Sequence, residues 1–267
     1  MSELSVSLGQ VRAEQKSFWR NPTAAFFGFA FPLMFLLIFG TIFKGQTVCV
    51  DGYYNNRGQC VGGGVQVPYN TFFVPTMAAW GVLTTCYVNL AMSVTNRRDA
   101  GLLKRLRGTP LPPAAYVVGV VGSALITALI TVALTELVGH YLYSAPWPAH
   151  WLQSLVIVLL GGAVFCALAM AVTVLIPNAD AAIAVVNISY LPLLFISGFF
   201  FSFNDTVLND IAKVFPIYWF KEAMLTAFGA RLSVSGWDGG DLLVLLAWGV
   251  VGLAIALRFF RWMPRRA

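Results

Sequence analysis

Residues 152–176 read LQSLVIVLLGGAVFCALAMAVTVLI, with no acidic or basic side chain among them. About 20 mostly apolar residues are needed for a helix to cross roughly 30 Å of hydrocarbon, so this stretch predicts a membrane-spanning helix. The whole chain is 58% hydrophobic and only 10% charged, and its mean hydropathy is +0.76. A soluble domain carries about 25% charged residues. We therefore expect an all-α integral membrane protein in which a single transmembrane domain covers residues 1–267.

Five more stretches have the length and composition of spans, which brings the expected number of transmembrane helices to six. The segment 1–23 mixes apolar and charged residues and predicts a helix lying on the inner membrane surface, although a disordered tail is the alternative. Two short amphipathic pieces near 205–214 and 217–229 predict a re-entrant or interfacial helix pair at the outer face. The five further spans are expected at about 24–43, 72–95, 114–141, 181–203 and 240–259.

Basic residues gather in the N-terminal tail, in the loop 96–113 and at the C-terminus. Lys and Arg are enriched in loops on the cytoplasmic side of membrane proteins. This distribution predicts that both termini are cytoplasmic and that the protein is a multi-pass component of a cell membrane, inner or plasma. No basic helix with an aromatic platform occurs, so the positive net charge does not predict a nucleic-acid partner.

The polar, glycine-rich loop 44–71 cannot span a bilayer and is placed outside by the same topology. It contains Cys49 and Cys60, with turn-forming glycines between them. If the loop faces an oxidising compartment, we expect the two cysteines to form a disulfide that closes a hairpin. Cys86 and Cys166 fall inside apolar spans and predict buried packing residues.

The sequence lacks the common catalytic motifs. It has no G-x-x-x-x-G-K-[ST] phosphate loop, no H-E-x-x-H and no G-x-S-x-G, and no His/Cys cluster suggests a metal. We expect no enzyme activity and no cofactor bound by this chain. Glu136 is the one clear acid inside a span, where an ionisable group is a functional hypothesis. We favour the alternative that it lies at the outer water boundary or pairs with a neighbouring helix.

The most informative loop is 96–113, NRRDAGLLKRLRGTPLPP. Leu102, Leu103 and Leu106 fall at i, i+1 and i+4, which predicts a short amphipathic helix with one apolar face. Such a helix could dock into a groove on a cytosolic partner. An ordinary basic loop that only sets the topology is the alternative.

The order of these parts resembles the membrane subunit of type-2 ABC exporters, the family of drug-resistance and polysaccharide-export permeases. The resemblance covers nearly the whole chain. It is carried by Arg98-Asp99-Ala-Gly101-Leu102 through Leu106, by Thr109-Pro110, and by LPLLFISGFFF at 191–201. The chain departs from the family in having Asp99 where Glu is frequent and in its long, cysteine-bearing first outer loop.

The resemblance implies that two permease subunits pair, as a homodimer or a heterodimer in the membrane lipid. It also implies that each binds a separate ATPase subunit, which holds ATP and Mg. The loop helix would be the coupling helix, with its leucines in a groove of the ATPase and Arg97, Arg98 and Arg105 on the rim, while the N-terminal helix would help to hold the ATPase. The coupling residues expected on this basis are Arg97, Arg98, Asp99, Gly101, Leu102, Leu103, Lys104, Arg105, Leu106, Thr109 and Pro110.

In the family the translocation route runs along the dimer interface and is lined by the second and fifth spans. Its aromatic, weakly polar composition here suits an amphipathic drug-like or lipid-like cargo that moves outward. A non-transporting membrane scaffold or channel, and a membrane enzyme acting on a lipid-linked substrate, are the rival interpretations. The route would offer Phe73, Thr76, Trp80, Thr84, Tyr87, Asn187, Tyr190, Leu194 and Phe195.

Overall fold

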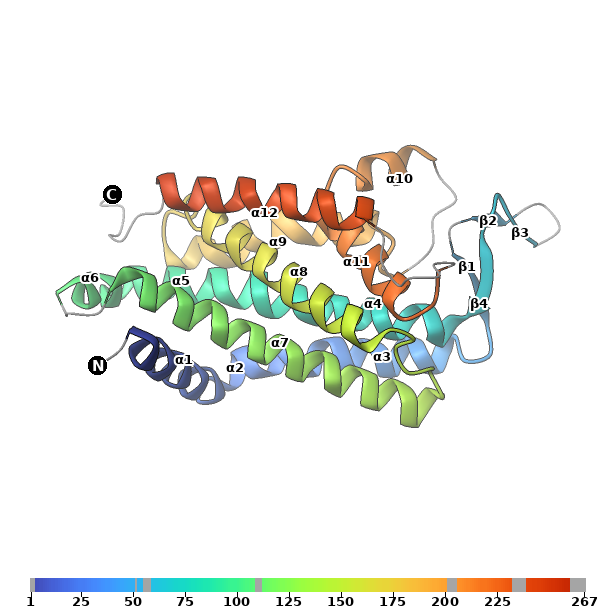
Figure 1. The fold of residues 1–267 in the computed structure, drawn as a ribbon, viewed down its shortest axis with the longest axis horizontal. Coiled ribbons are helices and arrows are strands. Elements are labelled where there is room, and N and C mark those ends of the chain that lie inside the picture. The colour runs from blue at the N-terminus through green and yellow to red at the C-terminus, as the bar shows by residue number, and fades with distance from the viewer. Residues whose placement is uncertain are drawn as a thin grey trace.

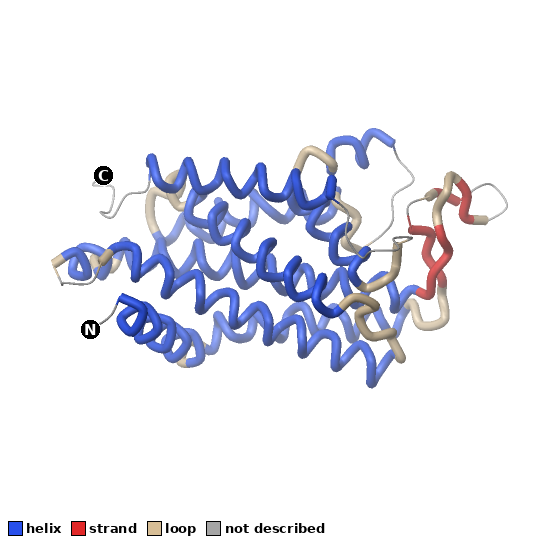
Figure 2. Tube along the Cα trace, in the orientation of Figure 1, coloured by secondary structure: helices blue, strands red, loops and turns tan. Residues whose placement is uncertain are grey.

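The structure, a computed structural model, describes residues 3–50, 52–54, 59–108, 112–200, 206–231 and 239–259. Long helices lie side by side along one direction, and the strands gather at one end of the bundle (Figures 1 and 2). We call this the hairpin end. The opposite end, which we call the α6 end, carries the beginning of α1 (Glu3–Trp19), the short helix α6 (Leu102–Arg107) and the last turn of α12 (Gly239–Phe259).

Five helices are long and apolar enough to cross a membrane. One of them is a continuous helix over Tyr69–Asp99, in which a π-helical stretch, η2, joins α4 to α5. The chain is therefore a multi-pass membrane protein, and five of the expected spans are found in the expected order. These helices are α4 (Tyr69–Leu83) with η2 (Thr84–Asn89) and α5 (Leu90–Asp99), α7 (Pro113–Tyr143), α8 (Trp151–Val172), α9 (Ala179–Ile196) and α12.

The first expected span, 24–43, is built from three consecutive helical pieces. They are α2 (Pro22–Ala25), the π-helical η1 (Phe26–Ala30) and α3 (Phe31–Ile42). The apolar helix Gly28–Ile42 within them is shorter than the five spanning helices, so a count of six spans stays a prediction. The fifth span was predicted to reach residue 203, but α9 ends at Ile196 and the chain turns at Gly198, whose φ of 70° suits glycine.

The N-terminal segment is a helix, α1, and not a disordered tail. It ends before Pro22 and packs along α7. The Gln15 side-chain amide donates to the carbonyl of Ser123 at 2.7 Å and to the hydroxyl of Thr127 at 3.0 Å. A Cβ atom at Gly119 of α7 would lie 2.2 Å from the Cγ of Gln10, so this glycine permits the close approach of the two helices.

A hydroxyl ladder, defined here as Ser123, Thr127, Thr131 and Thr135, follows the buried face of α7 at four-residue spacing. Each threonine donates to the carbonyl four residues earlier, at 2.8 to 2.9 Å. The three threonine hydroxyls are therefore satisfied within their own helix, which is how such groups are tolerated at membrane depth.

The polar outer loop forms two short antiparallel pairs, in which β1 (Thr47–Val50) pairs with β4 (Val65–Pro68) and β2 (Tyr53–Tyr54) pairs with β3 (Cys60–Val61). The predicted disulfide between Cys49 and Cys60 is present, with the two Cα atoms 5.4 Å apart. It ties the two strand pairs together at the hairpin end.

The expected short helix pair is also present, as α10 (Thr206–Ala212) and α11 (Pro216–Ala227). α10 lies on the outside of the bundle (Figure 1) and exposes Val207 and Ile211. α11 is almost wholly buried against α4, α8 and α12. Burial in protein is what permits a short helix at membrane depth, so α11 is compatible with the re-entrant alternative.

Candidate functional site

The segment that joins α5 to α6 makes a sharp turn at the α6 end of the bundle (Figure 1). α5 ends at Asp99, and Gly101 has a φ of 70°, the left-handed conformation that commonly ends a helix. The Gly101 carbonyl then accepts a hydrogen bond from the Arg105 amide at 3.2 Å, within the first turn of α6. The turn therefore fixes where α6 projects from the end of α5.

Arg97 joins α5 to the N-terminal helix. Its guanidinium contacts both carboxylate oxygens of Glu14, at 2.7 Å and 2.6 Å. The Glu14 side chain is almost fully buried and also accepts a hydrogen bond from Gln10 at 2.9 Å. Two-pronged Arg–carboxylate pairs combine charge with a fixed geometry, so this contact sets the position of α1 relative to α5.

Arg98 and Asp99 hold the turn between α8 and α9. Arg98 donates to the carbonyls of Thr173 and Ile176 at 2.8 Å and 2.6 Å. Asp99 accepts a hydrogen bond from the backbone N–H of Ala179, the first residue of α9. A cation thus lies at the C-terminal end of α8 and an anion at the N-terminal end of α9, which is the favourable arrangement for both helix dipoles.

The position of Arg98 corrects the expectation that it forms the rim of a partner's groove. Its side chain is only 4% exposed. Within this chain it satisfies the carbonyl of Thr173, which caps the end of α8, and that of Ile176 in the turn that follows. We therefore assign Arg98 to the internal structure of the α6 end.

The leucines of α6 do not share one exposed face. Leu103 is fully buried in the core of the chain, whereas Leu102 is 45% exposed. Successive side chains on a helix diverge by about 100°, so one of the pair turns inward when the other faces out. The expectation that Leu103 enters a partner's groove is thus wrong, and the exposed set on α6 is Leu102, Lys104 and Arg105. The side chain of Leu106, together with Thr109 and Pro110, lies outside the described residues.

A sequence model of the ABC-2 type transporter family matches residues 10–228. The chain belongs to the ABC-2 type transporter family. The match runs from α1 to the end of α11 and includes the α5–α6 turn. A search of curated proteins found no match to this sequence.

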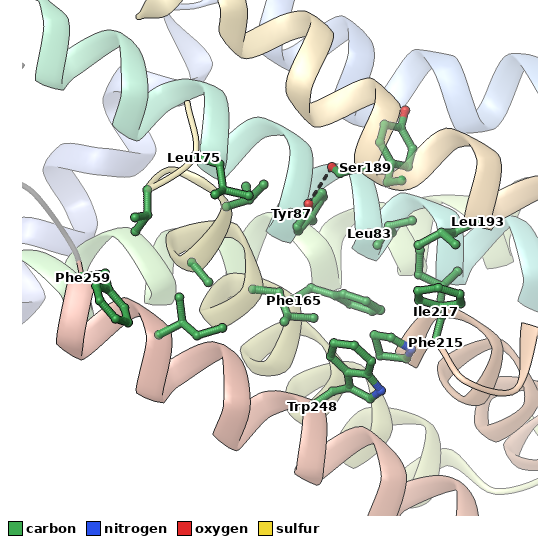
Figure 3. Close-up of a pocket in the computed structure, with 17 residues that line it drawn as sticks. Leu83, Tyr87, Phe165, Leu175, Ser189, Leu193, Phe215, Ile217, Trp248 and Phe259 are labelled. Carbon is green, nitrogen blue, oxygen red and sulfur yellow. Dashed lines mark hydrogen bonds between the residues drawn. The ribbon is translucent and has the colours of Figure 1, made fainter. Parts of the chain in front are cut away.

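The permease contains an apolar cavity of about 570 Å³ between α8, α9 and α12. Tyr87 of η2, Leu83 of α4 and the start of α11 complete its walls. Figure 3 shows Trp248 and Phe259 along the α12 wall, with Ser189 and Leu193 on the wall formed by α9. This volume is in the range of pockets that bury a small ligand.

Most polar atoms of the cavity lining are occupied within the permease. The hydroxyls of Tyr87 and Ser189 are 2.7 Å apart and share a hydrogen bond (Figure 3). The Trp248 indole donates to the Val214 carbonyl at 3.0 Å. Tyr190 adds one more hydroxyl-bearing side chain to the lining. The remaining lining side chains are apolar, so the cavity favours hydrocarbon over a polar ligand.

The residues predicted to line a translocation route separate into two groups. Phe195 is 53% exposed and Asn187 is half-buried, both on α9, while Tyr87 and Tyr190 line the cavity. The rest pack inside the permease itself, so they do not face a second subunit, which corrects the expectation for them. That buried group is Phe73, Thr76, Trp80, Thr84 and Leu194.

A buried charge cluster near the hairpin end was missed by the sequence analysis. Lys221 contacts Glu222 at 2.7 Å, and Arg231 contacts Glu222 at 3.5 Å and Asp241 at 3.1 Å. The cluster joins α11 to the first turn of α12, and its charges balance. The Lys221–Glu222 pair inside an apolar stretch was the only signal that could have found it. Truncating one member of such a pair leaves an uncompensated buried charge, so we assign the cluster a structural role.

Two further expectations concern acids and metals. Glu136 of α7 is only 7% exposed, so the packing places it inside the permease and not at its surface. Within the described ranges, no group of three or more His, Cys, Asp or Glu side chains is arranged to hold a metal ion.

Proposed function

We propose that this chain is the membrane-spanning permease subunit of an ATP-driven exporter. It would pair with a second permease subunit and be driven by separate ATPase subunits that bind ATP and Mg at the α6 end. The observation that carries the proposal is the fixed attachment of the α5–α6 turn to α1, α8 and α9 through Glu14–Arg97 and the contacts of Arg98 and Asp99. Because the end of α5 is bonded to α1, α8 and α9, a displacement of α6 would move these helices as well.

The charge distribution supports a cytoplasmic α6 end. Arg12 and Lys16 are exposed on α1, Arg20 is exposed just after it, and Lys104 and Arg105 are exposed on α6. Exposed basic residues are characteristic of cytoplasmic loops. The Cys49–Cys60 disulfide at the hairpin end fits an oxidising exterior, as expected of a protein in the cell membrane.

A displacement of α6 would be transmitted to α9 through the end of α5. α6 follows α5 directly after Gly101, and Asp99 at the end of α5 bonds to the first amide of α9. An ATPase with different contacts in its ATP-bound and ATP-free states would therefore shift α9 as a rigid body. The chain itself would supply no chemistry to this cycle.

α9 is the helix that we propose faces the second permease subunit. Together with α12 it buries the smallest share of its length among the five spanning helices. Its exposed face carries Ile183, Ile188 and Phe195, with Asn187 beside them. This apolar, aromatic and weakly polar surface suits an amphipathic drug-like or lipid-like cargo moving outward along the interface.

The test is the substitution Leu102→Asp in the tagged chain, purified in mild detergent from membranes of the cells that make it. Leu102 is exposed, so the folded chain should survive the change, whereas a groove on the ATPase should reject the carboxylate. We expect the wild-type preparation to hydrolyse ATP and the variant to lose most of the co-purified ATPase. Leu102→Met should retain it.

The matched control is Leu152→Asp at the start of α8, which is 68% exposed and lies toward the hairpin end. It introduces the same group far from the proposed contact and should leave ATP hydrolysis unchanged. A wild-type preparation without ATPase activity would contradict the proposal and favour a non-transporting scaffold or channel. Equal loss in both aspartate variants would show that Leu102 has no specific part in coupling.

A further inference from the structure

The cavity between α8, α9 and α12 extends along the half of α12 nearer the α6 end. α12 begins at the hairpin end and finishes at the α6 end (Figure 1). Its cavity-lining residues run from Trp248, near the middle of the helix, to Phe259 in its last turn. A rise of 1.5 Å per residue puts about 16 Å between them. Half of the hydrocarbon thickness of a bilayer is about 15 Å, so the cavity has the length of one leaflet's hydrocarbon.

Near mid-depth the cavity is lined by two aromatic side chains, Trp248 and Phe215. Trp248 stacks on Phe215 with the ring centroids 6.4 Å apart, and its indole is held by the Val214 carbonyl. Figure 3 shows Trp248 and Phe215 together at this end, with Phe259 at the other. A hydrocarbon chain inserted from the α6 end would contact this pair after about 16 Å.

The other end of the cavity reaches the surface of the molecule. Leu175, Ile255 and Phe259 all line the cavity and are all exposed. Because these residues lie at or near the α6 end of a bundle that spans the bilayer, the molecules that meet them are lipids of that leaflet. The molecule best placed to enter the cavity is therefore a lipid, through one of its hydrocarbon tails.

The charge at this end suits an anionic headgroup. Arg258 is exposed and follows Ile255 by three positions, so the two project from neighbouring parts of the same face of α12. An arginine at the α6 end of the bundle, where the lipid headgroups lie, can donate two parallel N–H hydrogen bonds to a phosphate.

The geometry points to a binding site for one hydrocarbon tail of an anionic phospholipid, drawn from the leaflet at the α6 end, with Arg258 beside its headgroup. The tail lies between α8, α9 and α12 within a single subunit, apart from the proposed route along the exposed face of α9. Because both α9 and α12 form walls of the cavity, the bound tail sets their separation. The inference requires only a bilayer, so its failure would leave the proposed ATPase partnership untouched.

The experiment uses the full chain in lipid nanodiscs that contain a phosphatidylglycerol with a photoreactive diazirine at mid-tail. After illumination, adducts are located by peptide mass spectrometry. We expect adducts on the lining peptides of α8 and α12. Ala171→Phe fills part of the cavity from α8, and displacing about two methylenes of the tail should lower the adduct yield roughly tenfold.

The control for this variant is Ala163→Phe, the same change on the same helix at an exposed position outside the cavity. It should leave the adduct yield unchanged. Leu193→Ala changes the cavity in the opposite direction, because it removes bulk from the α9 wall. It should preserve or raise the adduct yield. The tail site therefore stays testable even if Ala171→Phe has a folding defect. Equal adduct yields in the wild type, Ala171→Phe and Leu193→Ala would overturn the tail site.

The headgroup is tested by Arg258→Gln, with a zwitterionic phosphatidylcholine probe in parallel. We expect the wild type to prefer the anionic probe and the variant to lose that preference while keeping its adducts at the same peptides. An unchanged preference would overturn the role of Arg258. If a second copy of the chain fills the cavity instead, the lining will stay unlabelled and Ala171→Phe will reduce the dimer fraction, which would also overturn the proposal.

Discussion

The carboxylate of Glu14 lies against the guanidinium of Arg97, with both oxygens within 2.7 Å of its nitrogens. Glu14 belongs to the N-terminal helix and Arg97 to the last turn of α5, two residues before that helix ends. This contact makes α1 a part of the assembly at the α6 end and not a separate membrane anchor. A shift of α5 must therefore carry α1 along or break the pair.

Glu14→Gln should release α1 from α5. The change leaves the partly buried Arg97 without its charged partner, and hydrogen bonds to charged groups contribute about 1.5–3 kcal/mol. We expect a lower thermal midpoint in detergent and faster proteolysis within α1. Arg12→Gln changes an exposed charge on the same helix and should alter neither quantity. Protease resistance equal to that of the wild type would mean that packing on α7 alone holds α1.

Asp99→Asn should weaken the start of α9. The carboxylate accepts the Ala179 N–H at the positive end of the helix, and the neutral amide keeps the shape of the side chain but loses the charge. We expect a loss of about 1.5–3 kcal/mol in the free energy of unfolding. Slower hydrogen exchange in the wild type than in the variant at residues 179–182 would locate the effect.

Asp180→Asn is the matched control, because Asp180 lies in the first turn of α9, beside the Ala179 amide that Asp99 bonds, but is exposed. It removes the same charge near the same helix end, and its effect should stay within about 0.3–1 kcal/mol. Equal effects of the two substitutions would show that the hydrogen bond of Asp99 adds nothing to its charge.

The Cys49–Cys60 disulfide should protect both thiols from a maleimide reagent until a reductant is added. The cross-link closes a short loop between two strand pairs, and disulfides of this kind contribute about 2–4 kcal/mol. A gel-shift assay in a chain that lacks Cys86 and Cys166 isolates the two outer cysteines. Labelling without reductant would contradict the bridge, and the thermal midpoint should fall once it is reduced.

The spans and the disulfide were predictable because each depends on local sequence. An uncharged apolar run such as 152–176 can only form a membrane-spanning helix in lipid, and Cys49 and Cys60 lie in one turn-rich loop. The direction of Leu103 was not predictable, because periodicity groups apolar residues without telling the protein's own core from a partner's groove. The role of Arg98 depends on the carbonyls of Thr173 and Ile176, which are distant in sequence. The cavity has walls from several separate helices, and no local pattern reports such a space.

Gly161→Ala should separate α11 from α8, and it tests whether burial of the short helix depends on this contact. A Cβ atom at Gly161 would lie 2.2 Å from the Phe220 ring, whereas a Cβ at Gly9 on α1 meets nothing within 4 Å. Phe220 is fully buried, so its ring has no free space to enter. Overpacking of this kind costs about 1–3 kcal/mol.

The matched variant Gly9→Ala should be neutral or stabilising by up to about 1 kcal/mol, because alanine favours a helix interior over glycine. Thermal unfolding of both variants in the same detergent gives the comparison. A Gly161→Ala protein as stable as the wild type would mean that α11 can shift as a unit. The buried pairs of Glu222 and Arg231 would then have to move with it, and hydrogen exchange at residues 216–227 would rise as they loosened.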